Sequence, residues 1–252
     1  MLHGQPSWSY LYRKMIPVLT DAGYRVIAPD HIGMGRSDKP VDPRVHQFEQ
    51  HVTWLKSFVS SLALTDITLF VQDWGSHFGL RMAGDNPDNF ARIVLANGDL
   101  AVIPAGLNPF TVQVFEFDET IEGTVAFLSQ GPTDRAGSFQ HWMTFSATAP
   151  FLFVGDILDL LTVNTLTEAQ LIAYNAPFPA PIYRAGPRAF PSMVAGIETQ
   201  NVPAYEALGR FDRPFMFLGG DSDPRQGSVE NQNKWTAHVP GALGQAHKRY
   251  DA

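Results

Sequence analysis

Short runs of apolar and β-branched residues, each bounded by turn residues, mark the strands that the sequence predicts. We place four of them, at Arg25–Ala28, Ile67–Val71, Arg92–Ala96 and Pro214–Gly219. Runs of this length and composition are typical of strands that lie buried in a parallel sheet. The pattern therefore predicts a sheet built from segments that are far apart in the chain.

Helical periodicity separates the first two of these strands. In segment 46–63 the apolar residues recur every three or four positions, a spacing that puts them on one face of a helix, and they are Val52, Leu55, Phe58, Val59 and Leu62. Segments 7–22 and 75–84 are also predicted helices. Because strands alternate with helices, we expect right-handed βαβ units and an α/β fold, in which helices flank a mostly parallel sheet.

The pattern changes between residues 105 and 197, where the sequence is apolar, aromatic and proline-rich and contains no clear strand. This segment follows the strand at 92–96, so it leaves the sheet at the carboxyl ends of the strands, where ligands bind in parallel sheets. We therefore predict a helical cap at 105–197, inserted into a core formed by 1–104 and 198–252. Its aromatic side chains also fit plain packing within the cap.

Composition narrows the range of functions. The 252 residues are 44% apolar and 17% charged, as in ordinary soluble proteins. A formal charge of −7, with no cluster of Lys and Arg, argues against nucleic acid as a partner. The absence of cysteine excludes disulfides and thiolate metal sites. No leader or membrane-length apolar stretch is seen, so we expect no membrane association and take the cytoplasm as the default location.

The motif with the clearest chemistry is Val71-Gln72-Asp73-Trp74-Gly75-Ser76, where a strand ends and a helix begins. Hydrolases place their nucleophile at this turn, the elbow written G-x-S-x-G, and here Asp73 occupies the nucleophile position. A carboxylate becomes a better nucleophile when it is poorly solvated and aligned with an electrophilic carbon, and the product is an ester. The alternative is that Asp73 only caps the helix.

A second turn, His3-Gly4-Gln5-Pro6, supports the nucleophile reading. We expect the two turns to lie side by side, so that the backbone N–H groups of Gln5 and Trp74 form an oxyanion hole. That hole would stabilise the tetrahedral intermediate formed when water attacks the Asp73 ester. Taken alone, the segment could be a plain turn, since Gly and Pro occur in loops of every kind.

An acid that steers a histidine base is expected after the strand at 214–219. Gly220-Asp221-Ser222-Asp223-Pro224 follows that strand, and we choose Asp223 by its spacing from the flanking glycines, with Asp221 as the alternative. Both could instead be turn residues, which their composition also fits. The other acid position, just after the strand at 92–96, holds Asn97.

The sequence resembles the haloalkane dehalogenases, in particular the subfamily with two halide-binding tryptophans. The resemblance is carried by HGQPSWSYLYRKMIPVLTDAGYRVIAPDHIGMGRSDKPVD at 3–42 and VQDWGSHFGL at 71–80, and it continues in 165–179, 185–195 and 215–224. It implies the α/β-hydrolase fold and displacement of halide by a carboxylate. Hydrolysis of the ester then releases alcohol, halide and a proton, without a cofactor.

The resemblance also implies how the halide is held. Trp74 matches the tryptophan after the nucleophile, and Trp142 matches the cap tryptophan by its distance from Thr165-Leu166-Thr167-Glu168. An indole offers one N–H donor and no acceptor, which suits an anion in an apolar wall. We expect Phe139 and Phe190 to line a small apolar pocket. The expected partners are a small halogenated hydrocarbon, water and halide. We expect the protein to be a monomer.

Two departures from the family are visible. The family histidine base follows the last strand in a Gly-His-Phe context, whereas here His247-Lys248-Arg249-Tyr250-Asp251 leads directly into Ala252. His238 and His247 lie at unsuitable positions, so we assign neither as the base, and the sequence resembles a fragment that is cut at both ends. His77 stands where an apolar residue is expected, and we predict a surface or hydrogen-bonded histidine rather than a base.

Two other functions remain open. An epoxide hydrolase uses the same aspartate elbow but protonates the epoxide oxygen with cap tyrosines, for which Tyr174 and Tyr183 are available. The cap tryptophan favours the dehalogenase. A non-catalytic or single-turnover protein is supported only by the missing histidine. Without a base, we expect the chain to alkylate Asp73 once and then stall, because only the hydrolytic step needs a proton acceptor.

Overall fold

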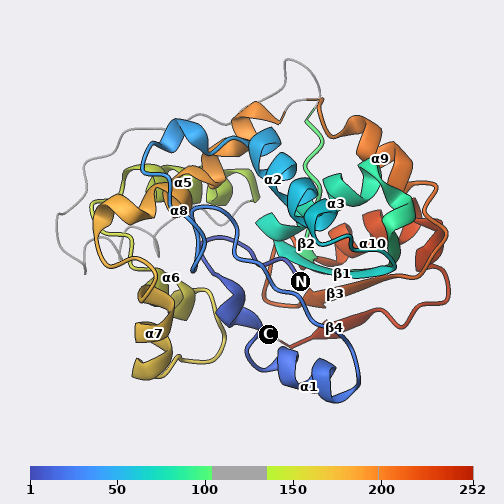
Figure 1. Cartoon of the computed structure of the whole chain (residues 1–252), viewed down its shortest axis with the longest axis horizontal. Coiled ribbons are helices and arrows are strands. Elements are labelled where there is room, and N and C mark those ends of the chain that lie inside the picture. Colours follow the sequence, from blue (N-terminus) through green and yellow to red (C-terminus); the bar gives the residue numbers. More distant parts are fainter. Residues whose placement is uncertain (104–134, 198, 252) are drawn as a thin grey trace.

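A four-stranded parallel sheet forms the centre of the molecule (Figure 1). The computed structural model describes residues 1–103, 135–197 and 199–251. The strands run in the order β1-β2-β3-β4, and they are β1 (Ile67–Asp73), β2 (Phe90–Gly98), β3 (Phe215–Gly220) and β4 (Lys248–Tyr250). Leu2 adds one parallel bridge to Val71 on the other side of β1. The predicted α/β fold is confirmed.

The sheet is covered on both faces. In Figure 1 the helices above it are α2 (Phe48–Ser61), α3 (Trp74–Asp85), α9 (Val202–Leu208) and α10 (Val229–His238), and α1 (Met15–Asp21) lies below. Alternate strand residues such as Leu69, Ile93 and Phe217 are buried beneath these helices, together with Phe78 of α3. This burial of apolar surface between the sheet and these helices is the main driving force for the fold.

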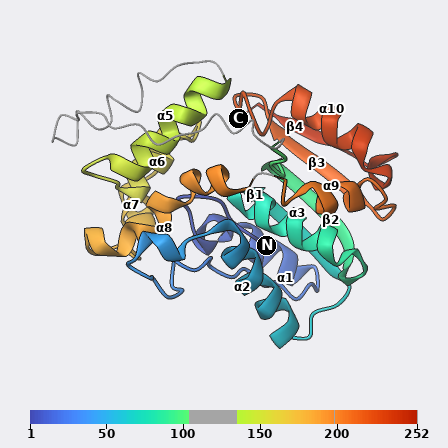
Figure 2. The same cartoon turned by 90° about the horizontal axis from the view of Figure 1, so that it is seen from above.

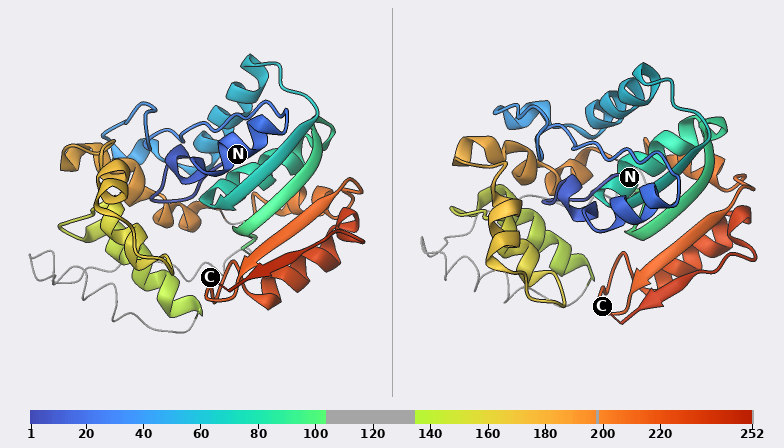
Figure 3. Two further views of the ribbon diagram at one scale, coloured as in Figure 1. Left: turned by 90° about the horizontal axis from the view of Figure 1, so that it is seen from below. Right: turned by 60° about the horizontal axis from the view of Figure 1, so that its bottom comes forward.

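Residues 135–197 form helices joined by short loops. They form α5 (Arg135–Thr148), α6 (Val154–Leu160), α7 (Glu168–Asn175) and α8 (Ala185–Ala189), gathered at the end of the molecule opposite α9 and α10 (Figures 2 and 3). No strand occurs between 135 and 197, as expected for a helical cap. The cap boundary near residue 105 lies outside the described residues, so the domain limits stay a prediction.

Short 3-10 helices make up the remaining regular structure. They are η1 (Ser9–Tyr12), η2 (Pro43–Val45), η3 (Pro87–Asn89), η4 (Pro181–Arg184), η5 (Pro191–Gly196) and η6 (Pro240–Ala242). Proline opens most of them, because its fixed φ suits the first turn of a helix. Among the helices that the structure describes, none is long and apolar enough to span a membrane.

Two predictions of secondary structure were wrong. Arg25–Ala28 forms no strand, and the carbonyl of Ile27 instead accepts a hydrogen bond from the Met1 amino group at 2.7 Å. A strand needs a ladder of partners, and Met1-Leu2 offers only this short contact. Segment 7–22 is split into η1 and α1, because Pro17 has no N–H to donate to the carbonyl one turn earlier. The helix therefore restarts with Pro17 in its first turn.

Candidate active site

Asp73 lies at the point where β1 turns into α3. Its backbone has φ 49° and ψ −126°, a left-handed conformation that costs energy for any residue with a side chain. Gly75 permits the sharp turn, since a Cβ there would lie 2.3 Å from the carbonyl oxygen of Leu2. The strand–turn–helix geometry predicted for the elbow is therefore present.

The His3–Pro6 turn packs directly against the elbow. The backbone N–H of Gln5 donates to Oδ1 of Asp73 at 2.7 Å. Gly4 makes this approach possible, because a Cβ on Gly4 would lie 2.4 Å from the Cβ of Asp73. The turn is held from behind by His31, whose backbone N–H donates to Nε2 of His3 at 3.1 Å and whose own Nε2 contacts the His3 carbonyl at 2.9 Å.

Burial raises the pKa of Asp73 above its ordinary value. The N–H groups of Trp74 and Gln5 act in the opposite direction because they stabilise the ionised carboxylate, and so does the charge of Arg225. The charge of Asp223 raises the pKa further, which places both Asp223 and Arg225 within electrostatic reach of Asp73. The site therefore contains a poorly solvated carboxylate with two backbone donors beside it.

Asp223 is held by hydrogen bonds on both carboxylate oxygens. Oδ1 accepts from the backbone N–H groups of Arg225 (2.8 Å) and Gln226 (3.1 Å). Oδ2 accepts from the backbone N–H of Gly227 and from Nδ2 of Asn97, both at 2.8 Å. Asp221, the alternative acid, is exposed and pairs with Arg249 at 2.6 Å. The structure therefore brings Asp223, rather than Asp221, into the neighbourhood of Asp73.

Sequence reasoning missed the structural part played by Asn97. This residue has φ 37°, and its side chain joins the ends of two strands: Oδ1 accepts from Gly220 N–H at 2.9 Å while Nδ2 donates to Asp223. Asn is among the side-chain-bearing residues that best tolerate a left-handed backbone. An asparagine directly after a predicted strand is the signal in the sequence that points to this role.

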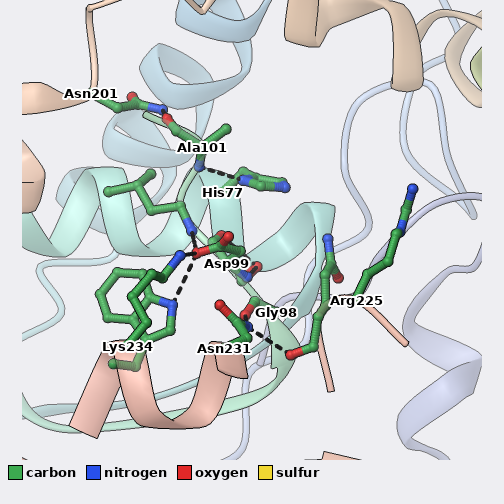
Figure 4. Close-up of polar contacts among 12 residues, drawn as sticks. His77, Gly98, Asp99, Ala101, Asn201, Arg225, Asn231 and Lys234 are labelled. Carbon is green, nitrogen blue, oxygen red and sulfur yellow. Dashed lines mark hydrogen bonds and ion pairs between the residues drawn. The ribbon is translucent and has the colours of Figure 1, made fainter. Parts of the chain in front are cut away.

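A second carboxylate near the site, Asp99, was also missed. Its Oδ1 accepts from the indole Nε1 of Trp235 at 2.9 Å and pairs with the ammonium group of Lys234, both from α10 (Figure 4). Its backbone N–H donates to Oγ of Ser76 at 2.8 Å. These contacts tie the loop after β2 to α10 and to the helix that begins at the elbow. Its partners are distant in sequence, so no local motif points to them.

His77 lies one turn after Asp73 on α3 and is buried. Its Nδ1 accepts the backbone N–H of Ala101 at 3.1 Å, which places the ring proton on Nε2 (Figure 4). Burial lowers the pKa of His77 to about 4, despite the opposing charge of Asp99. Of the two predicted alternatives, a surface or a hydrogen-bonded histidine, the structure shows the second, because the ring is buried. A neutral ring with its proton on Nε2 can take a further proton only at Nδ1, which already accepts the Ala101 N–H, and the ring would then be a buried cation.

The other two histidines considered from the sequence are engaged away from the elbow. Nδ1 of His247 accepts the N–H of Phe217 at 3.0 Å, and its Nε2 contacts the carbonyl of Ala242 at 2.9 Å. His238 stacks on Tyr205 with a centroid distance of 3.7 Å. No described histidine hydrogen-bonds to Asp223.

The residues predicted to bind halide and substrate each make a contact that the structure describes. The indole N–H of Trp142 donates to Oε1 of Gln5 at 3.1 Å. Trp74 is buried and contacts the ring of Phe190 with a centroid distance of 5.8 Å. Phe139 lies under the guanidinium of Arg225, 4.7 Å from ring centroid to Cζ. The contacts of Trp142 and Phe190 place residues of α5, and the residue directly after α8, next to the elbow.

A separate cavity of about 670 Å³ opens between the core and the cap. Residues 41–49 form one wall, and residues of α8 and η5 form much of the other. Neither Asp73 nor any of the four aromatic residues predicted at the site lines it. Neither of the two cap tyrosines lines this cavity. The hydroxyl of Tyr174 accepts a hydrogen bond from Arg13 at 3.2 Å, and Tyr183 is exposed to solvent.

Comparison with known proteins adds independent information. A family model described as the alpha/beta hydrolase fold matches residues 1–250. The chain is 42% identical to haloalkane dehalogenase 1 of Mycobacterium tuberculosis (strain CDC 1551 / Oshkosh), over all of this chain and 76% of that protein. It is 39% identical to a haloalkane dehalogenase of Psychrobacter cryohalolentis, over 98% of this chain and 73% of that protein. The chain thus spans about three quarters of the length of these relatives.

Solved structures lead to the same group of proteins. The haloalkane dehalogenase DpaA from Paraglaciecola agarilytica, described as tetrameric, superposes with a TM-score of 0.78 at 29% identity, over 99% of this chain and 75% of that one. The haloalkane dehalogenase DatA from Agrobacterium tumefaciens gives a TM-score of 0.68 at 25% identity, over 95% of this chain and 77% of that one.

Proposed function

The chain belongs to the haloalkane dehalogenases, a family with the α/β-hydrolase fold, and we propose that Asp73 is its nucleophile. The enzyme is a hydrolase that acts on carbon–halide bonds. The observation that carries the assignment of Asp73 is its place at the strained elbow, with its Oδ1 2.7 Å from the Gln5 N–H. A carboxylate whose pKa is raised by burial is poorly solvated, and this is the condition under which it attacks carbon best.

In the first half-reaction, one carboxylate oxygen of Asp73 attacks the carbon that bears the halogen. A carbon–oxygen bond forms as the carbon–halogen bond breaks, and the halide leaves with the bonding electron pair. No proton moves in this step. We assign Trp74 and Trp142 as the N–H donors that stabilise the departing halide, since its charge appears only as the bond breaks. Phe139 and Phe190 supply apolar surface for the alkyl group.

In the second half-reaction, water attacks the carbonyl carbon of the Asp73 ester. The N–H groups of Gln5 and Trp74 stabilise the oxyanion, which then collapses to release the alcohol and restore the carboxylate. The attacking water must lose a proton to a base, and Asp223 is the acid that would orient it. Because only this second step needs a proton acceptor, the two half-reactions are chemically separable.

The finer features of the substrate remain part of the proposal. We expect a small, uncharged haloalkane, because the aromatic residues assigned to the pocket offer contact area and few hydrogen-bonding groups. A monomer in the cytoplasm also stays a prediction, and DpaA is described as tetrameric. The epoxide hydrolase alternative is weakened, since Tyr174 is bound to Arg13 and Tyr183 is exposed.

A substrate panel tests this proposal. The chain is mixed with 1-bromobutane, bromoacetate and butyl epoxide, and both halide release and covalent adducts are measured. We expect reaction with 1-bromobutane and at most weak reaction with the other two. Preference for bromoacetate would contradict the apolar pocket, and turnover of the epoxide at a higher rate than 1-bromobutane would contradict the assigned halide donors.

A further inference from the structure

Gln5 connects the nucleophile to the cap through three hydrogen bonds. Its backbone N–H donates to Asp73 Oδ1 at 2.7 Å. Its side-chain Nε2 donates to the carbonyl of Pro187 at 2.7 Å, and its Oε1 accepts the indole N–H of Trp142 at 3.1 Å. The residue is only 7% exposed. Because a carbonyl can only accept and an indole N–H can only donate, these two partners fix which end of the amide faces Trp142.

The contact with Trp142 creates a competition. An indole has a single N–H donor, and in this structure that donor is directed to Gln5. A halide that uses the Trp142 N–H must therefore displace Oε1 of Gln5 or share the proton with it. Gln5 cannot turn its oxygen away without giving up the bond from Nε2 to Pro187.

We propose that Gln5 is a positioning residue that competes with the halide for the Trp142 N–H and so sets how tightly the halide is held. The inference rests on the halide role assigned to Trp142. A halide wins the competition when it is present, because charge-assisted hydrogen bonds are roughly twice as strong as neutral ones. When it leaves, the indole returns to Gln5, so that no buried donor is left without a partner. Gln5 therefore makes release of the product halide easier.

Two substitutions of Gln5 separate this role from a general packing role. Gln5→Met removes the acceptor but keeps a side chain of similar length, and we expect the bromide dissociation constant to fall about fivefold. Gln5→Glu supplies a charged acceptor that holds the indole and repels the anion, and we expect the constant to rise at least about tenfold. Both variants lose the bond from Nε2 to Pro187, so that loss cannot explain shifts in opposite directions. Both keep the backbone N–H of residue 5.

The measurement is saturable quenching of tryptophan fluorescence by bromide, with circular dichroism to confirm that each variant is folded. In a Trp142→Phe background, where the contested donor is gone, Gln5→Met should leave the bromide constant unchanged. Weaker binding by Gln5→Met in both backgrounds would overturn the competition and show a structural role. If Trp142→Phe alone leaves the constant unchanged, the halide assignment of Trp142 fails first, which is a distinguishable result.

Discussion

Two aspartates follow parallel strands of one sheet, and their surroundings differ. Asp73, after β1, has a left-handed backbone, and two backbone N–H groups, those of Gln5 and Trp74, stabilise its carboxylate. Asp223, after β3, accepts four hydrogen bonds, three from backbone N–H groups and one from Asn97. The carboxylate of Asp73 therefore keeps an oxygen lone pair available for attack on carbon. The carboxylate of Asp223 uses its lone pairs to accept hydrogen bonds.

The difference shows that the hydrogen bonds and burial of an aspartate, rather than its residue type, determine its chemical role. Each hydrogen bond stabilises a carboxylate and reduces its tendency to form a bond to carbon. Strain and burial at Asp73 act in the opposite sense, since burial raises its pKa and leaves the charge poorly solvated. We therefore assign attack to Asp73 and orientation of the base to Asp223.

The largest expected effect comes from Asp73→Asn, because the amide is a poor nucleophile. We expect halide release from 1-bromobutane to fall by at least about a thousandfold. Asp221→Asn is the matched control, since Asp221 is exposed and pairs with Arg249, and it should keep the parent rate. An undiminished rate in Asp73→Asn, with deamidation excluded by mass spectrometry, would remove Asp73 from its role.

A smaller effect, on stability rather than chemistry, is expected at the other aspartate. Asp223→Ala leaves the N–H groups of residues 225 to 227 and the amide of Asn97 without their acceptor. We expect the free energy of unfolding to fall by about 3 kcal/mol. Asp73→Asn should instead raise it at neutral pH, because the raised pKa means that the folded state disfavours the charged form.

Urea denaturation of the two variants measures both values under the same conditions. Equal losses of stability in Asp73→Asn and Asp223→Ala would contradict the contrast between a strained carboxylate and a fully bonded one. A loss in Asp223→Ala alone, or a loss there with a gain in Asp73→Asn, agrees with it.

The contrast extends to acid sensitivity, because His77 lies one turn beyond Asp73. Its pKa is lowered to about 4 by burial, against 6.5 for an exposed histidine. Between pH 4 and pH 6.5, His77 therefore binds a proton in the unfolded chain but not in the folded chain. The stability that neutral His77 contributes is complete above pH 6.5 and is lost as the pH falls toward 4.

Between pH 7 and pH 5 this loss amounts to about 2 kcal/mol for one such group. His77→Phe should remove it and make unfolding less dependent on pH over that range. Urea midpoints across the range measure the change. An unchanged slope in His77→Phe would show that His77 is not held neutral by the fold.

Much of the fold could be predicted because the strands are short apolar runs and apolar residues recur with helical periodicity in the helices. The elements β1, β2, β3, α2 and α3 lie where apolar spacing placed them. The strand expected at Arg25–Ala28 failed because composition does not reveal whether a neighbour is present to complete a ladder. The helix expected at 7–22 is interrupted before Pro17, because proline has no N–H to donate within the helix.

The sequence motifs of the site could be predicted, but its long-range hydrogen bonds could not. Asp73 and Gln5 were predicted to lie together, and the 2.7 Å hydrogen bond agrees. The hydrogen bond between Gln5 and Trp142 joins residues 137 positions apart, so no local spacing in the sequence predicts it. The same holds for Asn97 with Asp223 and for Asp99 with Lys234, which meet only because the sheet and α10 bring them together.

The central claim is that Asp73, and not Asp223, forms a bond to the substrate carbon. The most direct test is mass spectrometry of the peptides that contain these two residues, after incubation with 1-bromobutane in water carrying heavy oxygen. We expect the Asp73 peptide to carry a butyl ester, or heavy oxygen if the ester has been hydrolysed, and the Asp223 peptide to be unchanged. Bromide release with an unmodified Asp73 peptide, or a label on Asp223, would contradict it.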